Sequence, residues 1–304
     1  MNDEFATQLL ESFKLSKSLK RKTPPSVSAA FFALFLTVSM VSCIKENAVP
    51  AYLYVPSFSL STTAGQGTAA NKITDVWVYI DGQVQGIYQL PAQFPVVDLG
   101  NHEVQLFPGV RNNGIKSNPV IYPFFNTFKK TMELKSGKID TLRPTTSYVS
   151  GTNFKILEDF ELGNSLIVDR DQAPAFRFSQ VDNGFEGKCA GLTMTKTNSF
   201  FEKALTTKVQ LPDVSQSIFL EMHYKTQAPL SVGIFGTSAV SPNGATNYKI
   251  TLFPSDVWNK TYINLTNEVK DLKMTDFQVV FRSLLPDSTT IATIFIDNIK
   301  LLQR

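Results

Sequence analysis

Alternation between apolar and polar side chains, with a period of two residues, is the pattern that most constrains how this chain folds. It recurs after Cys43 between turn signals about every eight to twelve residues, without a helical pattern longer than about two turns. In Ile73–Ile80 the side chains alternate between two faces, and Asp81-Gly82 then supplies the left-handed residues of a tight hairpin turn. The 24 Phe, 16 Gly and 16 Pro residues fit many short strands and turns. The sequence therefore predicts an all-β protein.

Residues 1–42 differ from the rest of the chain. Basic residues crowd positions 14–22 without an acidic one, and the apolar run 29–41 follows before Ser42-Cys43. This run is too short for a transmembrane helix, which needs about 20 apolar residues. A basic flank, a short apolar core and a small residue before the cleavage point are typical of a secretory signal peptide. We therefore predict that 1–42 is a helical export signal and lies outside the mature fold.

The end of this signal, Met40-Val41-Ser42-Cys43, resembles the lipobox of bacterial lipoproteins, although Met40 stands where that family usually has Leu. In the family the cysteine becomes the first mature residue and carries acyl chains. The following Ile44–Asn47 is weakly similar to the surface-export tag of Bacteroidota envelope lipoproteins. The resemblance implies export and a lipid anchor at Cys43 in the outer membrane, with the periplasmic and surface faces both open. The alternative is an ordinary buried cysteine at the end of a signal peptide.

Charge and composition exclude several classes of function. Without the signal, basic and acidic side chains are almost equal in number, so the chain lacks the basic footprint of a nucleic-acid-binding protein. Its 2 Cys and 2 His argue against a disulfide framework and a histidine-rich metal centre. The GxSxG, HExxH, GxxxxGK[ST] and CxxC motifs are all missing from the sequence. We therefore predict that the protein is not an enzyme.

The length of 304 residues suggests two domains after the signal. The segment VWVYIDGQVQGIYQLPAQFPVVDLGNHEVQLFPG resembles PEGA-like and immunoglobulin-like envelope modules, which implies a β-sandwich over 43–150. A linker is predicted at 143–153 from its Pro, Ser, Thr and Gly content. The second domain, 151–304, contains nine strand candidates and turn signals that fit a sandwich.

Three motifs of the second domain resemble carbohydrate-binding-module-like jelly rolls: Glu158-Asp159-Phe160-Glu161, Gly187–Leu192 and Phe295–Leu301. Alternation places Asp297 on the same face as the apolar Phe295, Ile299 and Leu301, and a carboxylate on a buried face needs a partner. The resemblance implies a structural Ca²⁺ held by Asp297 and Glu161, with Asp159 as a weaker candidate. The alternative is an Asp297 that hydrogen-bonds to the backbone without an ion.

Sugar-binding modules bind their ligands through exposed aromatic rings, because the C–H faces of sugars stack on these rings. Trp258, in a predicted loop beside Pro254 and Asp256, is the best candidate for such a ring, and Tyr248 and Tyr262 are weaker ones. Aromatic residues of β domains also form cores, and that interpretation stays open for all three.

Glu221 and His223 lie two residues apart on one predicted strand, so their side chains share a face. Such a pair could do acid–base chemistry in a groove, but the solvated face of an outer sheet explains it as well. We therefore expect a lipid-anchored envelope protein that binds a ligand, such as a glycan, through its jelly roll. The first alternative is an accessory subunit of an envelope assembly that contacts protein only, and the second is a hydrolase that uses Glu221 and His223.

Overall fold

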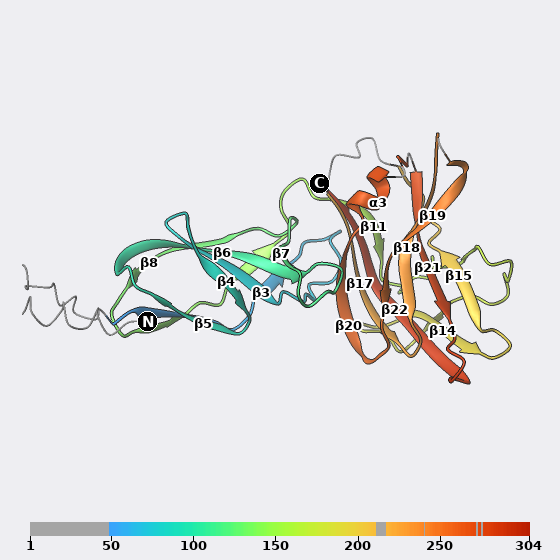
Figure 1. Cartoon of the computed structure of the whole chain (residues 1–304), viewed down its shortest axis with the longest axis horizontal. Helices are drawn as coiled ribbons and strands as arrows, with labels where there is room; N and C mark the ends of the chain where they lie inside the picture. The colour runs from blue at the N-terminus through green and yellow to red at the C-terminus, as the bar shows by residue number, and fades with distance from the viewer. Residues whose placement is uncertain (1–48, 211–216, 240, 272, 275) are drawn as a thin grey trace, which may run out of the picture. The chain divides into compact units, whose positions relative to one another are not determined.

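The computed structural model describes residues 49–210, 217–239, 241–271, 273–274 and 276–304 (Figure 1). The predicted signal 1–42 and Cys43 lie outside these residues. The described part consists of β strands and one short helix, α3 (Thr266–Asp271), which confirms the all-β prediction. No described helix has the length and apolarity needed to cross a membrane.

Residues 51–147 form three sheets whose apolar sides meet in one hydrophobic cluster. The first consists of β5 (Ala92–Val96), β1 (Ala51–Val55) and β9 (Ile139–Thr141), and the second of β10 (Thr145–Ser147) and β2 (Ser59–Ser61). The third consists of β4 (Gln83–Gln89), β3 (Asp75–Ile80), β6 (Gly100–Arg111), β7 (Pro119–Ile121) and β8 (Phe128–Leu134). Strands β3 and β4 pair antiparallel around Asp81 and Gly82, whose φ angles are 49° and 79°, so the predicted hairpin is confirmed.

Residues 153–303 form two six-stranded sheets that pack face to face. Sheet I consists of β13 (Ser179–Val181), β14 (Cys189–Thr195), β22 (Ile291–Gln303), β17 (Ile218–Thr226), β20 (Ser255–Asn264) and β11 (Asn153–Glu158). Sheet II consists of β12 (Val168–Asp169), β15 (Phe200–Ala204), β21 (Asp276–Leu284), β18 (Leu230–Ser238), β19 (Ser241–Leu252) and β16 (Val209–Gln210). Figure 1 shows β17, β20 and β22 in one layer and β18 and β21 in the next.

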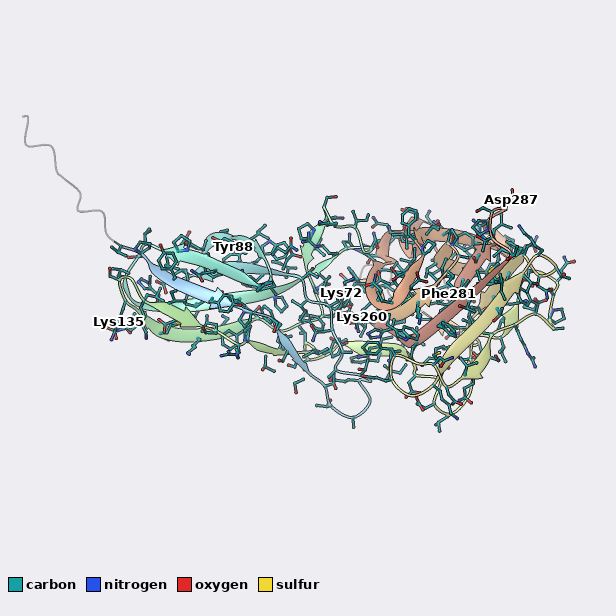
Figure 2. All side chains as sticks on the ribbon, turned by 90° about the horizontal axis from the view of Figure 1, so that it is seen from below. Lys72, Tyr88, Lys135, Lys260, Phe281 and Asp287 are labelled. Carbon is teal, nitrogen blue, oxygen red and sulfur yellow. The ribbon has the colours of Figure 1, made fainter. Side chains whose placement is uncertain are left out.

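The core of this sandwich is built by the alternation that the sequence displays. Leu220 and Met222 of sheet I and Val232 of sheet II are fully buried between the layers, as is Phe281, which Figure 2 labels. Because every second residue of these strands is apolar and inward, the intervening residues lie on the outer faces. Those outer faces carry the candidate sites.

The hydrophobic cluster of residues 51–148 continues onto the outer face of sheet I. It includes Phe219, Tyr262 and Leu302, which belong to β17, β20 and β22. Residues 49–304 accordingly form one compact unit. The predicted domain boundary near residue 150 coincides with a change of sheet between β10 and β11, and independent domains on its two sides stay a prediction.

Candidate functional site

One half of the outer face of sheet I is closed by a buried ionic network centred on Glu221. Lys260 Nζ lies 2.9 Å from Glu221 Oε2, and the hydroxyls of Tyr122 and Tyr148 donate to Oε1 at 2.9 and 3.0 Å. Burial raises the pKa of Glu221, but the Lys260 and Lys300 ammonium groups outweigh it and hold the pKa below its ordinary value. Glu221 is therefore a buried carboxylate in direct contact with Lys260, Tyr122 and Tyr148, and it also feels the charge of Lys300.

The segment preceding β3 crosses this network and covers it. Lys260 Nζ donates to the carbonyl of Ala70 at 2.9 Å, and Lys300 Nζ donates to the carbonyl of Thr68 at 2.6 Å. The backbone N–H of Lys72 donates to the Tyr262 hydroxyl at 3.0 Å, and Figure 2 labels Lys72 and Lys260 where the segment meets β20. Tyr262 is only 2% exposed as a result. This corrects the expectation of an exposed platform at Tyr262, since its ring offers no face to a ligand.

His223 lies next to the network but makes different contacts. Its ring stacks on Phe185, with centroids 4.0 Å apart and planes 12° from parallel, and the residue is 3% exposed. Burial, assisted by the Lys260 and Lys300 charges, lowers the pKa of His223 to about 3. Both interpretations of Glu221 and His223 are therefore wrong, because the buried pair lies neither on a solvated face nor in an open groove where acid–base chemistry could occur.

The other half of the same face is open and carries three rings, Phe185, Trp258 and Phe295, which we call the aromatic strip. The Trp258 ring centroid lies 6.3 Å from that of Phe185 and 6.4 Å from that of Phe295. Phe185 is 40% exposed, and the other two rings are half-buried. The best candidate of the sequence thus lies on an open aromatic surface, on strand β20 rather than in the expected loop.

A groove of about 300 Å³ begins at the Phe295 end of the aromatic strip. Phe295 on β22 lies opposite Gly191 on β14, which in turn lies opposite Ser179 on β13. A Cβ at Gly191 would come 2.7 Å from Val181 Cγ2 and 3.3 Å from the Phe295 ring, so a larger residue there would force these side chains to shift. Ser179 and Thr193 hydroxyls and the Arg177 guanidinium line the groove, and Arg177 has no hydrogen-bond or ion-pair partner among the described residues. The groove therefore offers polar donors next to apolar planes.

Tyr248 lies on sheet II, away from the aromatic strip. The Arg282 guanidinium carbon lies 4.1 Å from its ring centroid, and the tyrosine is half-buried. Its ring face is thus already covered by a cation, so Tyr248 is not an open stacking platform of the kind Trp258 offers.

The two residues of the predicted Ca²⁺ site both bind the backbone of the loop between β13 and β14. Asp297 Oδ2 accepts from the N–H groups of Phe185 and Glu186 at 2.8 and 3.2 Å, and its Oδ1 accepts from Asn298 N–H at 2.7 Å. Glu161 Oε1 accepts from Lys188 N–H at 2.7 Å. Burial raises the pKa of Asp297 to about 6, although the three N–H groups oppose this.

These contacts test how well the pair would suit a metal ion. N–H donors already occupy both oxygens of Asp297, and no group of three or more His, Cys, Asp or Glu side chains among the described residues is placed to hold a metal. The backbone-bonded alternative accounts for the geometry of Asp297, and Ca²⁺ at Glu161 and Asp297 stays a prediction.

Phe185 and Phe295 were not recognised as site residues from sequence. The alternation predicted for 295–301 breaks, because β17 and β22 shift register between Glu221 and His223 and Asn298 adopts a φ of 50°. Ile294, Ile296, Ile299 and Leu301 are in the core, so Phe295 lies on the outer face instead of beside Ile299. Phe185 follows the Asn183-Gly184 turn signal, but turn signals do not reveal on which face a loop residue lands.

The fold and the site together define a two-sheet β-sandwich with an open aromatic strip on one outer face. No protein-family model matches the chain. No curated protein matches it either.

Solved structures to which this chain is similar include carbohydrate-binding modules. One, from a study of modules of the β-sandwich superfamily, is 14% identical, covers 84% of this chain and 99% of its own, and has a TM-score of 0.36. The family 11 module of the cellulosomal cellulase Lic26A-Cel5E of Clostridium thermocellum is 16% identical over 50% of this chain and 95% of its own, with a TM-score of 0.34. TmCBM61, solved with β-1,4-galactotriose, is 13% identical over 48% of this chain and 95% of its own, with a TM-score of 0.32.

Proposed function

We propose that the protein is a non-catalytic glycan-binding protein whose binding surface is the aromatic strip with its adjoining groove. The observation that carries this proposal is the open row of Trp258, Phe185 and Phe295 beside a 300 Å³ hollow. Pyranose rings present apolar C–H faces and hydroxyl edges, which match aromatic planes flanked by hydroxyl and guanidinium donors. The burial of Glu221 and His223 favours binding over hydrolysis.

The lipid anchor is a second part of the proposal. A lipid on Cys43 in the outer membrane would hold this binding surface in the cell envelope, and the Met40–Cys43 resemblance to a lipobox supports it. In cells fed labelled palmitate, we expect label in the wild-type chain and none in Cys43→Ser, which should also leave the membrane fraction. Continued labelling of Cys43→Ser would contradict the anchor without bearing on glycan binding.

Affinity electrophoresis of the full chain in gels that contain one polysaccharide each tests the binding surface. We expect at least one neutral polysaccharide to retard the wild-type chain and Trp258→Ala to remove the retardation, because the variant loses a stacking plane. Phe253→Ala is the matched control, since Phe253 is 81% exposed and has no ring contact with the strip among the residues that the structure describes. Equal loss in both variants, or none in Trp258→Ala, would contradict the assignment to the strip.

A protein-contacting envelope subunit is the second candidate, and one observation favours it. Strand β4 lies at the end of its sheet, and its apolar Val84 and Ile87 are 66% and 53% exposed. Val84→Lys should then abolish cross-links to envelope proteins in whole cells, while glycan retardation stays unchanged.

A further inference from the structure

The outer face of sheet II carries two arginines that lie flat on aromatic rings. The Arg170 guanidinium carbon is 3.3 Å from the ring centroid of Phe235, and that of Arg282 is 4.1 Å from the centroid of Tyr248. Both pairs lie on the sheet opposite to the one that bears the aromatic strip. This face is therefore independent of the site of the proposed function.

Arg170 is held in place by residues on both sides of it in sequence. Its neighbours Asp169 and Asp171 each place one carboxylate oxygen 2.5 Å from Lys203 Nζ, and Lys203 is completely buried. Arg170 itself donates from its backbone N–H to the Glu202 carbonyl and from Nε to Glu202 Oε1, both at 3.1 Å. Arg170 therefore engages the Glu202 carboxylate, which lies opposite Arg282 on the neighbouring strand.

One cation of this face forms no ion pair among the described residues, although the acidic and basic side chains around it are equal in number, because two carboxylates share one ammonium group. Asp169 and Asp171 are paired with Lys203, and Glu202 is paired with Arg170. Arg282 is exposed, lies opposite Glu202 on β15 and Ser231 on β18, and forms no ion pair with any residue that the structure describes. A ligand with a negative group would supply the missing partner.

A groove of about 420 Å³ adjoins this cation. It is lined by apolar side chains and by hydroxyls: Phe200, Leu284, Pro229, Ser231, Ser283 and Arg282 itself. Phe200 and Leu284 are 41% and 63% exposed, so they present apolar surface to an incoming ligand. A sugar ring that carries a carboxylate combines an apolar face, hydroxyl edges and a planar anion that fits the guanidinium fork.

We propose that this face is a second binding site, in which Arg282 pairs with the carboxylate of a uronic-acid unit of an acidic polysaccharide. Phe200 and Leu284 contact the ring of that unit. The site does not require the aromatic strip, and it recognises a different class of polysaccharide.

Polygalacturonate and its fully methyl-esterified form are the probes, because they share a backbone and differ in charge. In affinity electrophoresis of the full chain, we expect retardation by the acid polymer and at least about tenfold weaker affinity for the ester. Arg282→Gln should weaken binding of the acid polymer by about the same factor. Arg143→Gln, which removes an exposed arginine from residues 49–150, is the charge-matched control and should bind as the wild type does.

The variants also separate this site from the aromatic strip. Trp258→Ala should keep its affinity for polygalacturonate even if it loses a neutral polysaccharide, and Arg282→Gln should show the reverse. Equal affinity for the acid and ester polymers, no retardation by polygalacturonate, or dependence on Trp258 in place of Arg282 would each overturn the proposal. Competition by polyglutamate as strong as by polygalacturonate would also overturn it, in favour of an acidic protein partner.

Discussion

His223 shows how one residue on the edge of a buried network acquires unusual chemistry. Its ring lies under Phe185, and its Nδ1 atom has no hydrogen-bond partner among the described residues. The neighbouring ammonium groups of Lys260 and Lys300 oppose a third positive charge. The imidazole is therefore neutral in the folded state far below the pH at which a free histidine is protonated.

This difference predicts an acid-sensitive stability. The pKa of His223 is lowered to about 3 in the fold and is about 6.5 in the unfolded chain, so between these values only the unfolded chain takes up the proton. The unfolding free energy should fall below pH 6.5 by up to about 1.4 kcal/mol per pH unit from this residue. Urea unfolding at pH 4.5 and 7.0 measures this fall in unfolding free energy. Between the two pH values, His223→Gln should lose less unfolding free energy than the wild type.

His102 provides a control, because its effect on the pH dependence of stability has the opposite sign. The Asp81 carboxylate, 2.6 Å from His102 Nδ1, raises the pKa of His102, so this residue stabilises the fold in acid and loses that effect as pH rises through the folded pKa. His102→Gln should make the acid loss steeper. A shallower loss in His102→Gln, or no change in His223→Gln, would contradict the assigned environments.

At the scale of strands and loops, the sequence could predict the features that depend only on neighbouring residues, such as strand alternation and tight turns. The alternation of Ile73–Ile80 and the Asp81-Gly82 turn are local features, and the structure has the hairpin they predict. The register shift opposite Glu221 is different, because it depends on which strands pair across more than seventy residues. That shift puts Phe295 on the outer face and makes Asp297 available to the β13–β14 loop, so the strip was only partly predictable.

The loop itself yields a prediction about Asp297. Its carboxylate accepts three backbone N–H groups, and Asp297→Ala would leave them without that acceptor. We expect a loss of about 1–3 kcal/mol of unfolding free energy. If hydrogen bonds are the whole role of Asp297, EDTA should leave the wild-type Tm unchanged, with or without added Ca²⁺. A Tm that falls in EDTA and returns with Ca²⁺, in wild type but not in Asp297→Ala, would instead support the metal site.

At the scale of the whole molecule, the buried network joins residues of the segment before 150 to the outer face of sheet I. Tyr122 and Tyr148, which directly follow β7 and β10, bond Glu221, while Lys260 and Lys300 belong to β20 and β22 of sheet I. The sequence did not reveal that Glu221 is buried, because the covering segment 67–72 has no apolar pattern. Its backbone carbonyls, which any residue type supplies, make the contacts with both lysines.

The network predicts that removing the Glu221 carboxylate costs more unfolding free energy than removing the Lys260 ammonium group. Glu221→Gln leaves two buried ammonium groups without an anion, and about 3–5 kcal/mol of unfolding free energy should be lost. Lys260→Met should cost less, because Lys300 still faces the Glu221 carboxylate. The double variant Glu221→Met with Lys260→Met should recover part of the loss. Equal costs for the two single variants would contradict the role of Lys300.

The fluorescence of the two tryptophans can follow unfolding separately in the two halves of the unit, the sheets of residues 51–147 and those of residues 153–303. Trp77 reports on β3 and Trp258 on β20, and Trp77→Phe and Trp258→Phe assign the fluorescence of each. In the wild type both signals should change at one urea concentration, because unfolding either half exposes Glu221 or its lysines without partners. In Glu221→Gln the two midpoints should separate, since the hydrogen bonds and apolar contacts that remain no longer impose a single transition. Coincident midpoints in Glu221→Gln would show that the apolar cluster around Phe219 and Leu302 couples the halves by itself.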